Sequence, residues 1–233
     1  MVAIKALSSI DGDESANETL FGLIAADIIK QGYSIRPGAL PETLANELFF
    51  HQQTMENEKF KNAGIGRGEK YLENEFVRTD EICWINGDTD AGQHWLNWTS
   101  QLQTFLNRRL FLGLFSFESH FAHYGSGDYY KRHYDAFKGE ANRVLSVVAY
   151  FNTNWTNEDG GELVLYQDDN DKQGTKVTPL LGTVVIFLSE EFPHEVLSAN
   201  RDRHSIAGWF RVNTSVTVLL AVPALYAEVY IGN

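Results

Sequence analysis

The fold is decided by seven short runs, rich in β-branched and aromatic residues, in the second half of the chain: FLGLFSFESHFAHY (111–124), VLSVVAYFN (144–152), GELVLY (161–166), TVVIFL (183–188), HEVLSA (194–199), RHSIAGWFRV (203–212) and SVTVLLAV (215–222). Gly, Asn and Asp clusters separate several of them, and no helical pattern of about 10–15 residues intervenes. This arrangement is typical of an antiparallel sandwich or barrel. We therefore expect a jelly-roll-like core over residues 111–222.

The first half of the chain has helical patterns instead. Residues 7–17 are polar, and we expect residues 1–17 to form a loose N-terminal arm. Behind this arm, apolar side chains repeat on one helix face, at Leu20, Ile24 and Ile28. A second helix is expected to start at Pro41, because proline suits the first helical position. Apolar residues at helical spacing predict a third helix over residues 92–109.

The predicted fold class is thus α+β, mainly β, with N-terminal helices packed on one sheet. Since the helices would cover an outer face of that sheet, we expect residues 1–233 to form a single domain. The helices that cover the sheet would lie within residues 18–110, which precede the core at 111–222. Within residues 18–110, a glycine-rich stretch of mixed charge predicts a mobile loop near residues 63–84.

Composition narrows the class of protein. The chain has 233 residues, 19 Lys and Arg against 31 Asp and Glu, and a formal net charge of −12. This acidic balance argues against nucleic-acid binding, which usually needs a basic face. About 43% of the residues are hydrophobic, enough for a sizeable core, but no run is long enough to span a membrane. With one cysteine, Cys83, and no signal-peptide pattern, we expect a cytoplasmic protein.

A candidate metal site is indicated by His133 and Asp135, which are two residues apart. In a strand, residues at this spacing point to the same face, so an imidazole and a carboxylate would project together. His194, at the start of a later run, is the candidate third ligand. Two histidines and one carboxylate leave several metal positions open, which suits Fe(II) better than zinc. The His-x-Asp pattern is weak evidence by itself, because such spacings also arise by chance.

Arg203 strengthens this interpretation. A short turn near Asn200 and Arg201 would bring it beside the metal, on the strand next to that of His194. An arginine among apolar neighbours is costly to bury unless an anion meets it, and its planar fork suits a carboxylate. Tyr124 and Tyr150 should flank the same pocket and add hydrogen bonds to that ligand, although each could equally be an ordinary core aromatic.

The order and spacing of these residues resemble the 2-oxoglutarate- and Fe(II)-dependent dioxygenases of the prolyl 4-hydroxylase group, including the hypoxia-inducible-factor prolyl hydroxylases and their bacterial counterparts. The similarity covers roughly residues 76–212. It rests on matches in this order: Arg78-x-Asp80-x-x-x-Trp84, Tyr124-Gly-x-Gly, His133-x-Asp135, Arg143 ahead of Tyr150-Phe-Asn152, Gly160-Gly161-x-Leu163, Pro193-His194-Glu195-Val196, Arg203 and Trp209.

The resemblance implies a double-stranded β-helix core with Fe(II) held by His133, Asp135 and His194. It implies 2-oxoglutarate as cosubstrate and ascorbate as a candidate reductant. The far carboxylate of the cosubstrate would bind Arg203, near residues that line the same pocket: Tyr150, Tyr124 and Trp209. By the same resemblance the substrate is a prolyl residue of a protein, hydroxylated at C4. Elongation factor Tu is a candidate if the source is bacterial, and oxygen sensing is a role known in this group.

Substrate binding is expected at Arg78, Asp80, Trp84 and Arg143. The related animal enzymes pair the arginine and aspartate at the positions of Arg143 and Asp80, which closes a loop over the target proline. We therefore expect an Asp80–Arg143 ion pair that forms or tightens on substrate binding, with Trp84 packed beneath the loop.

Two other functions remain open from the sequence. The same chemistry could act on a free amino acid or a small metabolite, which a deep and narrow entrance would favour. Alternatively, the jelly roll could bind metal as a sensor without turnover, and succinate release would exclude that.

Overall fold

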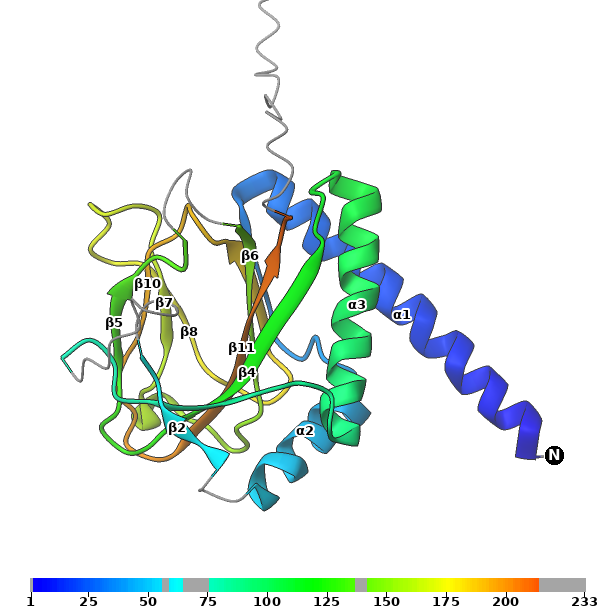
Figure 1. Cartoon of the computed structure of the whole chain (residues 1–233), viewed down its shortest axis with the longest axis horizontal. Coiled ribbons are helices and arrows are strands. Elements are labelled where there is room, and N and C mark those ends of the chain that lie inside the picture. Colours follow the sequence, from blue (N-terminus) through cyan, green and yellow to red (C-terminus); the bar gives the residue numbers. More distant parts are fainter. Residues whose placement is uncertain (1, 56–58, 65–75, 137–141, 214–233) are drawn as a thin grey trace, which may run out of the picture.

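Two antiparallel sheets face each other, and helices cover the outer side of the larger one (Figure 1). The computed structural model describes residues 2–55, 59–64, 76–136 and 142–213. This mainly β architecture confirms the predicted class and the jelly roll. The last predicted run, residues 215–222, lies outside the described residues, as do residues 65–75 of the predicted loop near 63–84.

The larger sheet has seven strands among the described residues. In spatial order they are β1 (Tyr33–Arg36), β9 (Val184–Leu188), β6 (Arg143–Tyr150), β11 (Arg203–Arg211), β4 (Ser116–Tyr124), β3 (Glu81–Trp84) and β2 (Lys61–Asn62). The central strands carry apolar side chains on both faces, because one face meets the helices and the other meets the smaller sheet. A sheet covered on both faces needs this continuous apolar pattern.

The smaller sheet supplies the opposite wall. Its strands, in spatial order, are β5 (Tyr130–His133), β10 (His194–Val196), β7 (Leu163–Leu165) and β8 (Thr175–Val177). The pairing of β10 with β5 is irregular: His194 lies opposite His133, whereas Val196 lies opposite Tyr130. Two steps along β10 therefore match three steps along β5, which is a β-bulge in β5.

The helices are α1 (Val2–Gln31), α2 (Glu42–Thr54) and α3 (Asp90–Leu110), and a 3-10 turn lies at Asn157–Asp159. α3 confirms the helix predicted over residues 92–109, and Thr89 caps it by accepting a hydrogen bond from the backbone of Gly92. Its buried face packs on the larger sheet, where Trp95 donates from Nε1 to Ser119 Oγ over 3.1 Å.

The expected loose arm at residues 1–17 is wrong, because α1 runs through it and extends away from the body of the protein (Figure 1). Residues 2–31 contain no proline and only isolated glycines, so nothing in this segment ends a helix once its later turns pack on α3. Of the described helices, none is long and apolar enough to cross a membrane.

Candidate active site

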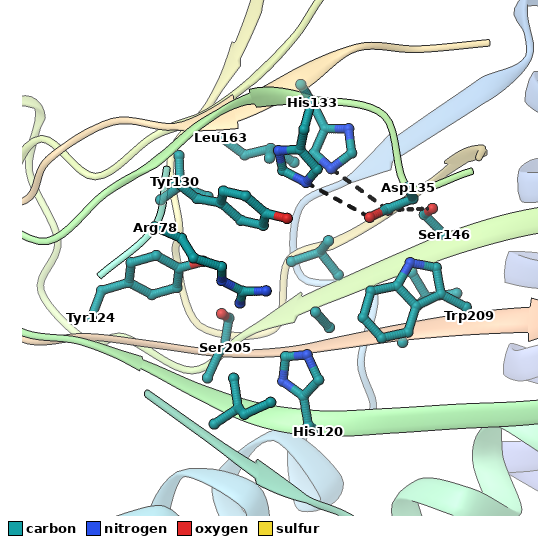
Figure 2. Close-up of a pocket in the computed structure, with 18 of the residues that line it drawn as sticks. Arg78, His120, Tyr124, Tyr130, His133, Asp135, Ser146, Leu163, Ser205 and Trp209 are labelled. Carbon is teal, nitrogen blue, oxygen red and sulfur yellow. Dashed lines mark hydrogen bonds and ion pairs between the residues drawn. The ribbon is translucent and has the colours of Figure 1, made fainter. Parts of the chain in front are cut away.

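A cleft of about 1330 Å³ opens between the two sheets (Figure 2). Its walls come from strands of both sheets, and it contains the candidate metal ligands and the candidate cosubstrate residues. Tyr150 is fully buried just behind the wall. The fold thus gathers the candidate ligand and cosubstrate residues in one cleft, although Tyr124 and Trp209, the first and last of them, are 85 positions apart in the sequence.

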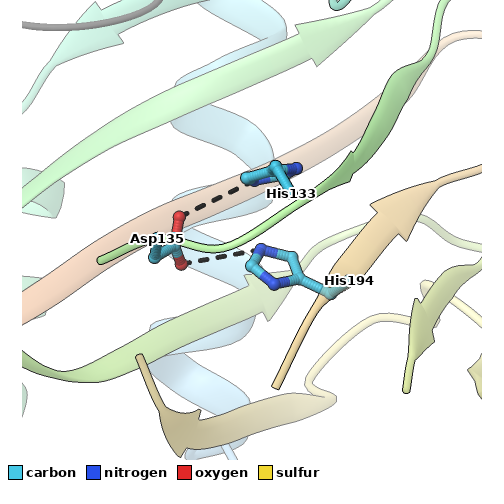
Figure 3. Close-up of side chains that lie close together, drawn as sticks. All are labelled: His133, Asp135 and His194. Atoms are coloured by element: carbon cyan, nitrogen blue, oxygen red, sulfur yellow. Dashed lines mark ion pairs between the residues drawn. The ribbon is translucent and has the colours of Figure 1, made fainter. Parts of the chain in front are cut away.

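His133, Asp135 and His194 converge in this cleft (Figure 3). One ligand atom from each of them lies within 4.8 Å of the others. The Nε2 atom of His133 is 3.7 Å from Asp135 Oδ1, and the Nε2 atom of His194 is 3.6 Å from Asp135 Oδ2. This cluster is the only one of its kind found among the described residues. The donor set, two imidazole nitrogens and one carboxylate oxygen with open positions, fits Fe(II).

The two histidines belong to paired strands, β5 and β10, and are directly opposite each other. Asp135 differs from the expected arrangement, because β5 ends at His133 and Asp135 lies in the bend that follows. Its carboxylate still turns toward both imidazoles (Figure 3). Strand alternation is therefore not what places this carboxylate beside His133.

Hydrogen bonds from Nδ1 orient both imidazoles. His133 Nδ1 is 2.8 Å from the carbonyl oxygen of Lys131, and His194 Nδ1 is 3.1 Å from that of Phe192. A carbonyl can only accept, so each Nδ1 carries the proton and each Nε2 keeps its lone pair. Burial also lowers the pKa of His194 to about 4, which keeps this ring neutral near pH 7. Both rings are thus in the form that binds a metal ion.

Asp135 is kept ionised by its neighbours. Burial alone would raise the pKa of its carboxyl group, but His194, His133 and the hydroxyl of Ser146 together hold it below the ordinary range. Ser146 Oγ donates to Asp135 Oδ2 over 2.6 Å and is itself 2.9 Å from Ser189 Oγ. Both serines are buried, so this short chain of hydroxyls fixes the orientation of the carboxylate.

We expect Ser146→Ala to weaken metal binding by about 10–100-fold, because the orienting donor to Asp135 is lost. Isothermal titration with Co(II) measures this effect without turnover. Ser119→Ala is the matched control, since Ser119 is also a buried serine of the larger sheet, but its hydroxyl bonds Trp95 and not Asp135 or Ser146. Equal Co(II) affinities for the wild type and Ser146→Ala would contradict the prediction.

Arg203 lies between two tyrosines at the inner end of the cleft. Its guanidinium carbon is 4.8 Å from the ring centroid of Tyr124 and 5.1 Å from that of Tyr150. Arg203 is about 1% exposed and donates to the carbonyl of Gly161 and to Ser205 Oγ, at 2.8 and 3.2 Å. A buried cation with no carboxylate beside it among the described residues is unstable alone and calls for an anionic ligand.

Two buried polar atoms in this region lack a hydrogen-bond partner among the described residues: Arg203 Nη2 and the hydroxyl oxygen of Tyr150. Burial raises the pKa of Tyr150 to about 12, so its hydroxyl stays a donor. Unpaired buried donors are costly, and a carboxylate placed between them would satisfy both. The residues therefore fit the far carboxylate of 2-oxoglutarate.

The expected path of the chain to Arg203 is wrong. β10 and β11 were expected to be neighbouring strands, but β10 belongs to the smaller sheet and β11 pairs with β4 and β6 in the larger one. Arg203 thus approaches the site from the opposite wall to His194. The polar segment between the strands crosses from one sheet to the other instead of forming a hairpin.

Trp209 forms part of the cleft wall beneath Arg143. The guanidinium carbon of Arg143 lies 3.7 Å from the Trp209 ring centroid, at cation–π distance. Glu118 holds this arginine in place, since its carboxylate accepts from Arg143 Nη2 and from Arg211 Nη1, each over 3.0 Å. Arg143 is therefore at the mouth of the cleft and tied to the larger sheet.

The expected Asp80–Arg143 ion pair is not present in the structure. Asp80 instead pairs with Arg78, with Nε–Oδ1 and Nη2–Oδ2 distances of 2.7 and 2.6 Å. The Asp80 side chain is fully buried, so its charge is compensated by this close arginine. Arg143 pairs with Glu118, as described above. The structure thus pairs Asp80 with Arg78.

Trp84 lies at the edge of the cleft and is about half exposed. Its ring meets His120 edge-on at a centroid distance of 5.2 Å. The expected packing of Trp84 beneath the loop also concerns residues 65–75, which lie outside the described ones. Burial lowers the pKa of His120 to about 4, so a neutral ring supports both Trp84 and Trp209.

Three site residues were missed from the sequence: Ser146, Glu118 and Tyr130. Ser146 occurs in an apolar run, where a lone polar residue could have been singled out, whereas Glu118 has polar neighbours and carried no such signal. Tyr130 carried no such signal, because strand alternation places a residue three positions before His133 on the other face.

Comparisons with known proteins agree with this geometry. A family model described as the 2OG-Fe(II) oxygenase superfamily matches residues 119–211. A prolyl-4-hydroxylase from Pseudomonas putida is 36% identical, with a TM-score of 0.74 over 83% of this chain and 99% of that one. A prolyl hydroxylase from Trichoplax adhaerens, solved with a peptide of hypoxia-inducible factor, is 26% identical, with a TM-score of 0.72 over 85% and 92%.

Proposed function

This chain belongs to the 2OG-Fe(II) oxygenase superfamily, within the prolyl 4-hydroxylase group, and from that premise we propose that it hydroxylates a prolyl residue of a protein at C4. It is a dioxygenase that uses Fe(II) and 2-oxoglutarate. The observation that carries the proposed substrate is the 36% identity to a prolyl-4-hydroxylase over nearly all of that chain. The complex of the Trichoplax adhaerens relative with a peptide also supports a protein substrate.

In the proposed mechanism, His133, Asp135 and His194 hold Fe(II) through Nε2, a carboxylate oxygen and Nε2. When bound, the iron and the cosubstrate would allow dioxygen to oxidise a substrate C–H bond. This oxidation is coupled to the conversion of 2-oxoglutarate to succinate and carbon dioxide. The protein itself supplies geometry. The hydrogen bonds to Lys131 and Phe192 keep both Nε2 atoms available toward the metal.

Arg203 and Tyr150 would bind the far carboxylate of 2-oxoglutarate with the donors that are unpaired in the structure. Tyr124 shields the Arg203 guanidinium from water on one face. Trp209 lines the cleft six positions further along β11, beneath Arg143. A charge-assisted bidentate contact in a buried place fixes the direction in which the other end of the cosubstrate points. That end would then reach the three metal ligands across the cleft.

For the substrate, we propose that Arg143 donates to a backbone carbonyl beside the target proline. It lies at the mouth, over Trp209, with one nitrogen 3.4 Å from the backbone oxygen of Asp135. Trp84 offers a half-exposed apolar surface at the same mouth. Arg78 and Asp80 would shape the floor as a pair.

The test is incubation of the purified protein with Fe(II), 2-oxoglutarate, oxygen and ascorbate, together with proline-containing peptides and intact elongation factor Tu. We expect a gain of about 16 Da on proline, one oxygen atom, with stoichiometric succinate. The variant Asp135→Ala is the control. Succinate release that depends on a free amino acid but never on a peptide would overturn the protein substrate. No succinate under any condition would favour a metal-binding sensor.

We also propose a cytoplasmic location, where a reducing environment would keep the iron as Fe(II). The single cysteine, Cys83, is free, in agreement with such an environment. A role in oxygen sensing would require turnover that varies with oxygen pressure in the physiological range. The same assay run at graded oxygen pressures measures this directly.

A further inference from the structure

Tyr130 stacks directly on the candidate metal ligand His133. The two ring centroids are 3.6 Å apart and the ring planes differ by 14°. The other face of Tyr130 is covered by Arg78, whose guanidinium carbon is 4.2 Å from the ring centroid. Figure 2 shows the tyrosine ring between the guanidinium and the imidazole. A cation, an aromatic ring and a metal-binding ring therefore form one stack.

The β-bulge in β5 makes this stack. In a regular strand Tyr130 and His133, three positions apart, would point to opposite faces. The extra residue between the pairs His194–His133 and Val196–Tyr130 shifts the alternation by one position. Both rings therefore face the cleft. Bulges next to active sites commonly redirect a side chain in this way.

The far end of the stack is anchored in the protein interior. Arg78 forms two hydrogen bonds to the fully buried Asp80, so its guanidinium plane is fixed. Backbone hydrogen bonds tie this segment to β5 on both sides of Tyr130. The backbone N–H of Thr79 donates to the Tyr129 carbonyl over 3.1 Å, and the backbone N–H of Lys131 donates to the Val77 carbonyl over 2.8 Å.

The stack restricts a motion that the hydrogen bond of His133 leaves open. The contact from Nδ1 to the carbonyl of Lys131 fixes one edge of the imidazole, but the ring plane can still tilt about it. A parallel ring at 3.6 Å blocks this tilt. The guanidinium on the far face adds a cation–π attraction that holds Tyr130 against rotation.

We propose that Tyr130 is a positioning residue for the metal ligand His133, and that the Arg78–Asp80 pair holds Tyr130 in place. This inference rests on the proposed function, because it takes His133 as a ligand. Metal affinity then depends on an arginine that contacts no ligand. Residues that orient metal ligands typically change affinity by about 10–100-fold when removed, and we expect an effect of that size from the loss of the Tyr130 ring.

The experiment is a titration of the full chain with Co(II). Calorimetry measures the affinity, and the visible spectrum of the bound metal reports its ligand geometry. Tyr130→Leu should weaken Co(II) binding by about 10-fold or more and shift the spectrum, because the imidazole tilts. Tyr130→Phe keeps the ring and should stay within about 3-fold of the wild type. Tyr129→Leu is the matched control, one position along the chain.

A double-mutant cycle separates this role from general damage. Arg78→Leu should weaken Co(II) binding on its own, and its effect should vanish in the Tyr130→Leu background, because both act through one ring. The proposal would be overturned if the effects of the two substitutions on Co(II) affinity simply add. It would also be overturned if Tyr130→Leu keeps the wild-type affinity and spectrum. If Tyr130→Leu does not fold, wild-type affinity and spectrum in Arg78→Leu would overturn it instead.

Failure of the proposed function gives a different result. If His133→Ala binds Co(II) as tightly as the wild type, the metal site itself is wrong. If wild-type protein binds Co(II) but hydroxylates no proline, the substrate assignment fails while the role of Tyr130 can still be measured.

Discussion

Replacement of either His133 or Asp135 by alanine is expected to abolish metal binding and turnover while the fold is kept. Each residue would provide one of the three proposed protein ligands, and both lie at the end of β5 and not inside the apolar core. Loss of a ligand should cost more than the roughly 10–100-fold expected for a residue that only orients one. Loss of the Asp135 charge also leaves the metal with two neutral ligands.

Co(II) titration and succinate production measure the two consequences separately, and circular dichroism checks the fold. His123→Ala is the matched histidine control, because His123 lies outside the cleft, near Glu81 and Asp202. Near-wild-type succinate production by either site variant would mean that the metal is held elsewhere.

Arg203→Ala is expected to raise the 2-oxoglutarate requirement far more than the metal requirement. A charge-assisted pair with a desolvated carboxylate should be worth about 2–5 kcal/mol, or roughly 30-fold or more in affinity. Arg203 is buried and its Nη2 atom has no hydrogen-bond partner among the described residues. Water therefore does not compete with the cosubstrate carboxylate for this guanidinium, and the full effect should be measured. Apparent KM values for 2-oxoglutarate at saturating metal give the measurement.

Arg203→Lys should restore only part of the affinity, since an ammonium group cannot reproduce the planar fork. Arg201→Ala is the matched control: Arg201 is two positions away, is exposed, and lies over Trp155 outside the cleft. An unchanged 2-oxoglutarate dependence in Arg203→Ala would show that another residue binds the far carboxylate.

The jelly roll and the metal cluster could be predicted from the sequence because both depend on local patterns. Short β-branched runs form strands in most contexts. His133 stands out through its spacing from Asp135, and His194 through its place at the start of an apolar run. The pairing of Arg78 with Asp80 was also accessible, because residues two apart in an extended segment share a face. The resemblance to related enzymes favoured Arg143 instead, and the structure shows Glu118 at that arginine.

Other features depend on information that no local pattern carries. The bulge that turns Tyr130 toward His133 exists only because β10 pairs with β5 in a shifted register. The crossing from β10 to β11 between the sheets reflects global topology, so the sequence alone could not place Arg203 beside its actual strand neighbours. The continuation of α1 through residues 2–17 shows that a polar composition does not prevent a helix when no breaker is present.

The division of the site between the two sheets has a consequence for the protein as a whole. His133 and His194 belong to the smaller sheet, whereas Arg203, Tyr124 and Tyr150 belong to the larger one. A cosubstrate that touches both groups acts as a removable cross-link between the layers. Binding to the native state alone adds about 2.7 kcal/mol of stability when the ligand is at 100 times its Kd. The resistance of the protein to unfolding and degradation should therefore rise and fall with the supply of 2-oxoglutarate.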